Sequence, residues 1–389
     1  MTAAHPYPRV EQPLDVGPVR LRNRIVRAAS GAGIARGVVN DDLVAYHRAR
    51  AEGGVALTIL GDGGVHRTAN GCFELWRDDF VDGYRRLADE CRAHGMVLFQ
   101  ELSHQGSAAV TGEPAWAPSP LANAMTGEIP RSMTQAMIDE VVEAFAGAAA
   151  RCRRAGLEGV EVHAAHGFLA GQFLSPSTNI REDAYGGDLE GRSRFLRELL
   201  VATRHAVGPG FPVGVRLSAT ELVAGGITVD ETCEVVELLQ AEDLVDFVDI
   251  SVGTLATYPT IIGGLHEPHG YQLAEARPVA RACRVPTIVT GRIHTLAEAE
   301  RILAAGTADL VSMVRPTIAD AYLVAKSLAG REAEVRPCIA CNECLRSMLG
   351  PLRRIGCAVA PAVGAGDVEA FEPAATPRSV LVAGGGPAG

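Results

Sequence analysis

The amino-acid sequence predicts an α/β protein built on a (β/α)8 TIM barrel, and three observations support this fold class. Eight short apolar segments alternate with longer segments of helical spacing, which is the pattern of parallel strands joined by helices. Eight such units fit within about 330 residues, and eight is the number that closes a barrel. The alternative, an open doubly wound sheet, needs a glycine-rich phosphate loop after its first strand, and the first apolar segment has none.

The eight predicted strands are short runs rich in valine, isoleucine and leucine. They cover residues 24–29, 56–60, 97–102, 159–163, 212–217, 247–252, 286–290 and 309–314. Helical segments lie between them, including residues 134–155, 191–207 and 295–306. Two capping boxes, Thr228-x-x-Glu231 and Thr295-x-x-Glu298, indicate helix starts, because the threonine and the glutamate each satisfy a backbone N–H.

The composition is that of a globular protein, with 47% hydrophobic and 21% charged residues. The net charge is −10, so we expect no nucleic-acid and no membrane partner, since both need a basic surface. No apolar run reaches about 18 residues, so no transmembrane helix is expected. The amino terminus lacks an apolar secretory segment. We therefore expect a cytoplasmic protein whose nine cysteines are thiols or metal ligands.

The character of the sequence changes after residue 332, where a cysteine-rich stretch begins. We therefore divide the chain into a barrel at residues 1–332, a cysteine segment at 333–360, a linker at 361–378 and a tail at 379–389. The tail reads as a strand followed by Gly384-x-Gly386-x-x-Gly389, which we interpret as the first strand and turn of an incomplete, Rossmann-like dinucleotide-binding domain. Within the barrel, residues 103–132 form a long loop, which is typical of a lid or a binding loop.

Four cysteines lie within twenty residues near the end of the chain: Cys338, Cys341, Cys344 and Cys357. Three thiolates spaced three residues apart on a tight turn can reach three corners of a cube, and the later cysteine supplies the fourth. This spacing is similar to the ligation of a [4Fe–4S] cluster. Zinc sites more often have two separated C-x2-C pairs, so a zinc knuckle and four free thiols are the alternatives.

Two histidines, His163 and His166, are three residues apart where the fourth predicted strand opens into its loop. Active sites of (β/α)8 barrels lie at this end of the strands. Each imidazole can donate a hydrogen bond to an oxygen that gains negative charge, as an oxyanion hole does. The alternative is that one of the two is a packing residue or a cap. We assign the pair to catalysis.

The segment that begins GVEVHAAHGFLAGQF at residue 159 resembles the signature of the Old Yellow Enzyme family of NADH:flavin oxidoreductases. The resemblance is dense over residues 159–196 and extends to the RPTIAD stretch after the eighth strand. With its cysteines, the chain is similar to the iron–sulfur branch, which contains 2,4-dienoyl-CoA reductases and trimethylamine dehydrogenases. The resemblance implies a barrel that holds FMN and a [4Fe–4S] cluster beside it. FAD is expected only in a C-terminal part that this chain lacks.

The resemblance also assigns flavin-binding roles at the strand ends. Arg216 matches the arginine that faces flavin N1 and O2, where a fixed cation stabilises the reduced ring. Glu101 stands where the family usually has a glutamine, and either Glu101 or its neighbour Gln100 makes the contact to the pyrimidine edge. The residues matched to the phosphate loops are Gly291, Arg292, Val314 and Arg315. Those expected to line the flavin by their backbone are Ala28, Ala29, Gly61 and Asp62.

Three departures from the family pattern concern the substrate and the flavin. Phe168 stands where ene-reductases have the tyrosine that protonates the substrate, and phenylalanine has no proton to give. Gly31 stands where amine dehydrogenases attach the flavin to a cysteine, so non-covalent FMN is expected; those enzymes also have tyrosine in place of His163. Thr254-Leu255 replaces the Trp-His of dienoyl-CoA reductases. Other proton donors are sought in the loop after the sixth strand: Tyr258, Tyr271, His266 and His269.

Together these patterns predict an NAD(P)H:flavin oxidoreductase that reduces an α,β-unsaturated carbonyl or a related electrophile, with the cluster as electron relay. One alternative is an amine dehydrogenase that passes electrons to a partner. Another, of a different class, is a non-catalytic electron-transfer subunit. The expected partners are the small-molecule electrophile, the nicotinamide nucleotide, an electron-transfer protein and a second copy of the chain in a homo-oligomer.

Overall fold

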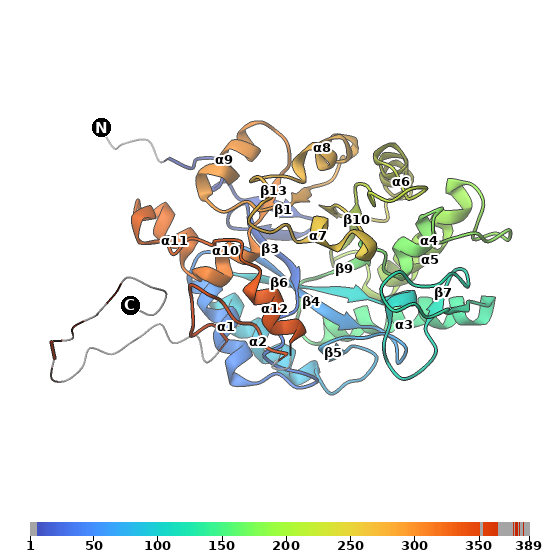
Figure 1. Cartoon of the computed structure of the whole chain (residues 1–389), viewed down its shortest axis with the longest axis horizontal. Coiled ribbons are helices and arrows are strands. Elements are labelled where there is room, and N and C mark those ends of the chain that lie inside the picture. Colours follow the sequence, from blue (N-terminus) through green and yellow to red (C-terminus); the bar gives the residue numbers. More distant parts are fainter. Residues whose placement is uncertain are drawn as a thin grey trace.

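The computed structural model describes residues 6–350 and 353–364, together with positions 376, 378, 379, 381 and 384. Eight parallel strands of its central sheet form the barrel: β3 (Ile25–Ser30), β4 (Leu57–Gly64), β6 (Val97–Ser103), β9 (Gly159–Ala164), β10 (Val213–Ser218), β11 (Phe247–Ser251), β12 (Thr287–Val289) and β13 (Leu310–Ser312). The first strand, β3, pairs with both β4 and β13, so the sheet closes on itself. The predicted (β/α)8 barrel is confirmed (Figure 1).

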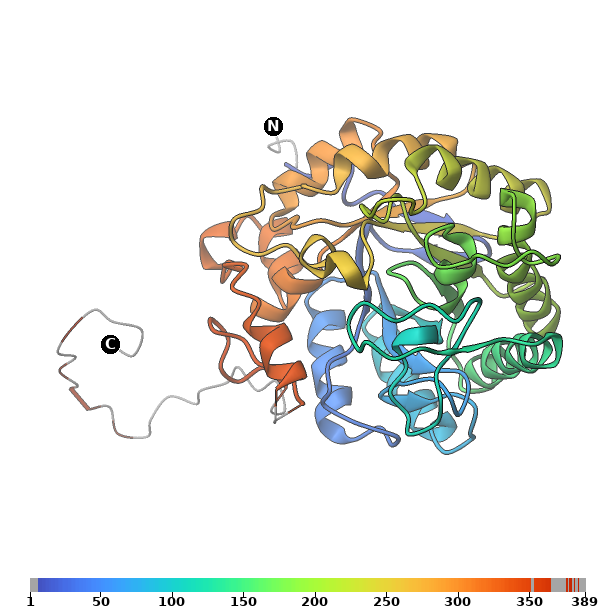
Figure 2. The ribbon, with the colours of Figure 1, turned by 45° about the vertical axis from the view of Figure 1, so that its right-hand side comes forward.

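Helices surround the barrel as an outer ring (Figure 2). They are α1 (Asp41–Glu52), α2 (Val81–Ala93), α3 (Gln135–Arg154), α5 (Leu189–Val207), α6 (Val229–Ala241), α8 (Leu273–Ala282), α9 (Leu296–Ala304) and α11 (Leu323–Leu328). Both predicted capping boxes are present, at the starts of α6 and α9. Gly208 ends α5 with a φ of 73°, a conformation that glycine adopts without a steric penalty. None of the described helices is long and apolar enough to cross a membrane.

Shorter elements follow the strands or close the barrel. The short helices are α4 (Leu169–Leu174), α7 (Tyr258–Ile261), α10 (Val314–Ala319) and α12 (Glu343–Leu349), and the 3-10 turns are η1 (Gly106–Ala108), η2 (Leu255–Thr257) and η3 (Glu332–Glu334). The small strands are β1 (Leu14–Val16), β2 (Val19–Leu21), β5 (Phe73–Glu74), β7 (Trp116–Ala117) and β8 (Arg131–Ser132). Because β7 pairs with β8, the second half of the predicted long loop after β6 is closed by a short two-stranded sheet.

Apolar side chains fill one end of the barrel interior and leave the other end for polar residues. The rings of Phe99 and Phe247 lie 5.6 Å apart although β6 and β11 are not neighbours in the sheet, so they meet inside the barrel. Val16 and Leu21 of the β1–β2 hairpin belong to the same buried cluster, which places the hairpin at this end. Close packing of apolar side chains at this end holds the polar residues at the other end in fixed positions.

The predicted strands agree with the observed ones to within a few residues at their ends. Site residues are affected at two strands. The second strand runs to Gly64, so Gly61 and Asp62 lie within it instead of following it, and Val314 begins α10 instead of ending the eighth strand. The cysteine segment is described except for residues 351 and 352. Most of the predicted linker (361–378) and of the tail with its GxGxxG turn (379–389) lies outside the described residues.

Candidate active site

A cavity of about 310 Å³ opens at the carboxyl-terminal ends of the barrel strands. This is the end at which (β/α)8 enzymes have their active sites, and the volume is within the range of ligand pockets. Nine of the residues assigned from the sequence line the cavity together: Ala29, Glu101, His163, His166, Arg216, Gly291, Arg292, Val314 and Arg315. Residues far apart in the sequence therefore meet at one site.

Two of the assigned backbone positions, Ala28 and Gly61, are not part of this lining. The pairing of β3 with β4 contains a register shift, and such a bulge re-aims the residues that follow it. Ser30 and Gly31 of this stretch line the cavity beside Ala29. Of Asp62 the structure describes only the backbone, within β4. Contacts of Ala28, Gly61 and Asp62 with a flavin stay predictions.

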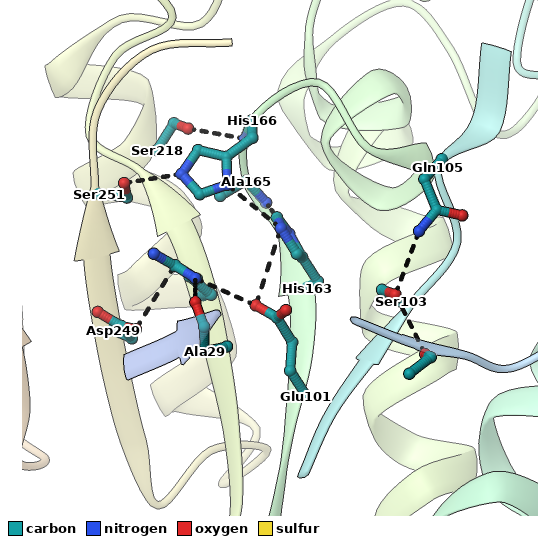
Figure 3. A network of polar contacts seen from close by, with 12 residues as sticks. Ala29, Glu101, Ser103, Gln105, His163, Ala165, His166, Ser218, Asp249 and Ser251 are labelled. Atoms are coloured by element: carbon teal, nitrogen blue, oxygen red, sulfur yellow. Dashed lines mark hydrogen bonds and ion pairs between the residues drawn. The ribbon is translucent and has the colours of Figure 1, made fainter. Parts of the chain in front are cut away.

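The two histidines lie against each other at the end of β9 (Figure 3). His163 Nε2 is 3.2 Å from His166 Nδ1, and the rings meet edge to face. His166 Nε2 is 2.7 Å from Ser251 Oγ at the end of β11. Burial lowers the pKa of both histidines well below the usual range, and the charge of Arg216 adds to this effect, so both rings are neutral. Neutral imidazoles can donate to an oxygen without carrying a charge themselves.

His166 has a φ of 59°, a backbone conformation that is uncommon for a residue other than glycine. Two hydrogen bonds hold it there. Its N–H donates to Ser218 Oγ at 3.0 Å, and its carbonyl accepts from the N–H of Leu255 at 3.0 Å. The predicted departure at Phe168 is also visible, since that ring stacks on His163 with centroids 4.3 Å apart. Phe168 thus fixes the face of His163 but supplies no hydroxyl.

Arg216 is a buried cation surrounded by carboxylates. Its Nη1 lies 3.3 Å from Glu101 Oε1 and 3.3 Å from the carbonyl oxygen of Ala29, and its Nε lies 3.5 Å from Asp249 Oδ2. Burial alone would lower the pKa of Arg216, but Asp249, Glu101 and Glu161 together raise it, so the guanidinium stays charged. Burial also raises the pKa of Glu161 well above its usual range.

The structure shows which of Glu101 and Gln100 faces the cavity, a choice that the sequence left open. Glu101 lines the cavity. Gln100 is turned away from it, because its Nε2 donates to the carbonyl oxygens of Leu60 and Glu101 and its Oε1 accepts from Tyr84. Neighbouring residues of a strand point to opposite faces, so only one of the two can face the barrel interior. Glu101 is that residue.

The part of the cavity after β12 and β13 is lined by two arginines, Arg292 and Arg315. Gly291 and Arg292 both have positive φ, of 116° and 58°, so the chain turns sharply after β12. Arg292 Nε is buried and makes no hydrogen bond to a described residue, although its Nη1 donates to the carbonyl of Leu265. Arg315 Nη1 donates to the carbonyl of Gly263 at 2.7 Å and to Asn342 Oδ1 at 2.6 Å. This end is basic and suits an anionic group.

All four assigned cysteines surround one small apolar cavity beside the barrel mouth: Cys338, Cys341, Cys344 and Cys357. In the part of the chain that the structure describes, no three His, Cys, Asp or Glu side chains are arranged to hold a metal ion. Thiolates around a single zinc ion lie about 3.8 Å apart, as its bond length dictates, whereas thiolates around a cluster are spread by the cluster between them. Arg315 lines both this cavity and the larger one.

Several site residues were missed by the sequence reasoning. The polar ones are Glu161, Ser218, Asp249 and Ser251, and the apolar ones, from α12, are Leu345, Met348 and Leu349. The polar residues could have been predicted from their spacing along the strands. Glu161 lies two residues before His163 and Ser218 two residues after Arg216, and a spacing of two puts residues on the same face of a strand.

A buried cation and an imidazole pair at the mouth of a parallel (β/α)8 barrel define the class of barrel enzymes with a preformed anion-stabilising site. Comparison with known proteins then identifies the particular family. Residues 10–334 match the NADH:flavin oxidoreductase / NADH oxidase family. The chain belongs to this family of oxidoreductase enzymes, and the predicted Old Yellow Enzyme resemblance is confirmed at that level.

Individual relatives agree with this assignment. A metal reductase from Desulforamulus reducens is 36% identical over 386 residues, which are 97% of this chain and 57% of that protein. A solved 2-naphthoyl-CoA reductase superposes with a TM-score of 0.89 at 30% identity, over 95% of this chain and 60% of that one. Histamine dehydrogenase from Rhizobium sp. 4-9 superposes with a TM-score of 0.85 at 28% identity, over 92% and 53%. The chain thus spans little more than half the length of these relatives.

Proposed function

We propose that this protein is an FMN-dependent oxidoreductase that uses NAD(P)H to reduce an α,β-unsaturated carbonyl or a related electrophile, with a [4Fe–4S] cluster as electron relay. The observation that carries the proposal is the position of two ring nitrogens. His163 Nε2 and His166 Nδ1 face each other at 3.2 Å in the cavity that Arg216 also lines. Two ring nitrogens placed in this way can both turn to an oxygen that gains negative charge and, when each carries a proton, stabilise it.

The residues of the cavity fit FMN. Arg292 Nε is a buried donor without a partner among the described residues, at the basic end where a phosphate would be held with Arg315. Gly291 keeps the turn beside Arg292 close to Gln272, because a Cβ there would lie 2.9 Å from the Cβ of Gln272. Arg216 would face the pyrimidine part of the ring together with Glu101. FMN, when bound, would supply the transfer of electrons between the nicotinamide and the electrophile.

The chain itself contributes binding, orientation and charge. The histidine pair would bind the carbonyl oxygen and hold the electrophile in one orientation, and the loss of one such donor costs about 10²–10³ in rate. Apolar side chains from α7, α12 and the loop after β11 would exclude water from the bound substrate, including Leu255, Ile261 and Met348. The lining therefore favours an uncharged, apolar electrophile.

The residues around the cysteine cavity fit a [4Fe–4S] cluster, because four thiols line it. The charged side chains beside these thiols are Arg315 and Glu343. Cys338, Cys341, Cys344 and Cys357 would be its ligands. Helix α12 supports a relay role, since Cys344 lines this cavity while Leu345, the next residue, lines the large one. A cluster here would add one-electron transfer to and from the site.

A second function, amine dehydrogenation with electrons passed to a partner, is favoured by the likeness to histamine dehydrogenase. The charges of the cavity oppose it. Among the described lining residues Glu101 is the one carboxylate, and it is paired with Arg216. A cationic amine would therefore meet Arg216, Arg292 and Arg315 without a carboxylate of its own. We rank the reductase above the amine dehydrogenase for this reason.

An anaerobic absorbance titration of the purified protein tests the proposal, with NADH, NADPH and a small tertiary amine added to separate samples. Bleaching of the flavin spectrum by a nicotinamide supports the reductase. Bleaching by the amine alone reverses the direction of electron flow. A reduced spectrum that then fails to reoxidise with any enone or quinone favours a non-catalytic electron-transfer subunit. Iron and acid-labile sulfide analysis of the same sample tests the cluster.

A further inference from the structure

A chain of hydrogen bonds runs through both site histidines and fixes the positions of their protons (Figure 3). The backbone N–H of Ala165 lies 3.1 Å from His163 Nδ1. A backbone N–H can only donate, so this nitrogen is an acceptor and carries no proton. His163 is buried and neutral, as described above. Its single proton is therefore on Nε2.

The proton of His163 in turn fixes that of His166. His163 Nε2 lies 3.2 Å from His166 Nδ1 but 3.8 Å from Glu101 Oε1, which is too long for a hydrogen bond. The Nε2–H of His163 therefore donates to His166 Nδ1, and His166 carries its own proton on Nε2. That proton points to Ser251 Oγ at 2.7 Å. In this state both ring donors are used within the protein.

This state leaves the Ser251 hydroxyl incompletely satisfied. Ser251 is buried, and its hydroxyl makes a hydrogen bond to no other described residue than His166. When Ser251 accepts from His166, its own O–H has no acceptor. When it donates to His166 Nε2 instead, the His166 proton must be on Nδ1, and two N–H groups then face each other across 3.2 Å. An oxygen acceptor within reach of both ring nitrogens satisfies all these donors at once.

We propose that Ser251 is a positioning residue that lets His166 exchange tautomers when an oxygen ligand binds. Without a ligand, the pair is closed by its own hydrogen bond. With a ligand oxygen present, the Ser251 hydroxyl rotates and donates to His166 Nε2, and both histidines donate to the oxygen. One proton leaves Nε2 and one is gained at Nδ1 of the same ring through exchange with water, so the net charge does not change. This inference rests on the proposed function of the pair.

Ser218 provides a matched control, because it contacts the same histidine but cannot act in this way. Its Oγ accepts from the N–H of His166 at 3.0 Å and donates to the carbonyl of Gly253 at 2.7 Å. Both roles of its hydroxyl are thus occupied by backbone groups. Ser218 holds the His166 backbone, whereas Ser251 contacts the ring. Loss of Ser218 should change stability without changing the tautomer.

Protein loaded with FMN and labelled with ¹⁵N-histidine tests the inference, with 4-nitrophenol as the oxygen probe. Histidine ¹⁵N chemical shifts distinguish a protonated from a bare ring nitrogen. In the wild type we expect the His166 proton on Nε2 without the probe and on Nδ1 with it. In Ser251→Ala we expect no such exchange and about 10- to 100-fold weaker probe binding, the effect of losing one hydrogen bond to a charged group. Ser251→Thr keeps the hydroxyl and should restore both.

The outcomes separate the inference from the proposed function. If His166→Ala does not weaken probe binding, the pair does not bind the oxygen, and both ideas are wrong. If His166→Ala weakens binding but Ser251→Ala leaves it and the tautomer exchange intact, the role of Ser251 alone is overturned. The same holds if Ser218→Ala blocks the exchange as fully as Ser251→Ala, because a general loosening of the site then explains both variants.

Discussion

Arg315 and Asn342 are joined by a hydrogen bond of 2.6 Å between Nη1 and Oδ1, which ties the cysteine segment to the mouth of the barrel. The same guanidinium donates to the carbonyl of Gly263, and Asn342 Nδ2 donates to the carbonyl of Ile262. The loop after β11, helix α10 and the turn between two of the cysteines therefore share one polar junction. Asn342 has a φ of 57°, which asparagine tolerates better than most residues.

Asn342→Gly should release the cysteine segment from the barrel while keeping the left-handed backbone, since glycine adopts it freely. The loss of the hydrogen bond to Arg315 should lower the free energy of unfolding by about 1 kcal/mol. Amide hydrogen exchange should become faster both around residues 338–345 and around residues 258–265. Asn342→Asp is the matched variant, because it keeps the acceptor for Arg315. Faster exchange in only one of the two segments would show that the junction does not couple them.

His163→Ala and His166→Ala should each lower the rate of enone reduction by about 10²–10³, because each removes one donor to the developing oxyanion. Reoxidation by oxygen, which presents no carbonyl to the pair, should change much less. Stopped-flow measurement of the two reactions on the same prereduced protein makes this comparison. Wild-type turnover of both variants with every electrophile tested would disprove the assigned role.

The barrel could be predicted because each strand is a short apolar run and most of the outer helices have a side-chain cap or a glycine stop, α8 being an exception. The positions of His163 and Arg216 could be predicted because the ends of barrel strands converge. The proton positions could not be predicted. They depend on the local turn that brings the Ala165 N–H to His163, and on Ser251, whose contact with His166 arises only when β9 and β11 are placed in the sheet. The choice between Glu101 and Gln100 likewise needs the inner face of β6.

Tyr258 is the proton donor that the structure favours among the four sequence candidates. It lines the cavity, and its hydroxyl makes no hydrogen bond to a described residue. Tyr271 also lines it, but its hydroxyl is occupied, accepting from Gly263 N–H and donating to Thr260. His266 and His269 are exposed and outside the lining. Tyr258→Phe should therefore lower enone reduction by about 10²-fold or more, the usual effect of a general acid.

Phe168→Tyr should raise the rate of enone reduction, because it supplies a hydroxyl beside His163, and it should rescue Tyr258→Phe in the double variant. Quinone reduction should stay nearly unchanged in all three proteins, since a quinone oxygen is protonated readily by water. Rates with one enone and one quinone, measured side by side, check both expectations. A flat response of enone reduction across the three variants would mean that protonation does not limit the reaction.

The stability of the protein should fall between pH 7 and pH 5, and His104 should account for part of the loss. Burial, followed by the nearby His66, lowers the pKa of His104 to about 3, whereas an unfolded histidine has a pKa of about 6.5. Below about pH 6.5 the unfolded chain therefore binds a proton that the folded protein does not. This difference destabilises the fold by about 2 kcal/mol at pH 5 relative to pH 7.

His104→Gln should remove this contribution, because glutamine does not titrate and can still accept the hydrogen bond that His104 Nδ1 receives from the Gly106 N–H. The measurement is the free energy of unfolding in urea at pH 7 and pH 5 for both proteins. The wild type should lose about 2 kcal/mol more than the variant over this interval. Carboxylates and the other buried histidines titrate in both proteins, so their contributions cancel in the difference. An equal loss in the two proteins would mean that His104 takes up its proton in the folded state as easily as in the unfolded one.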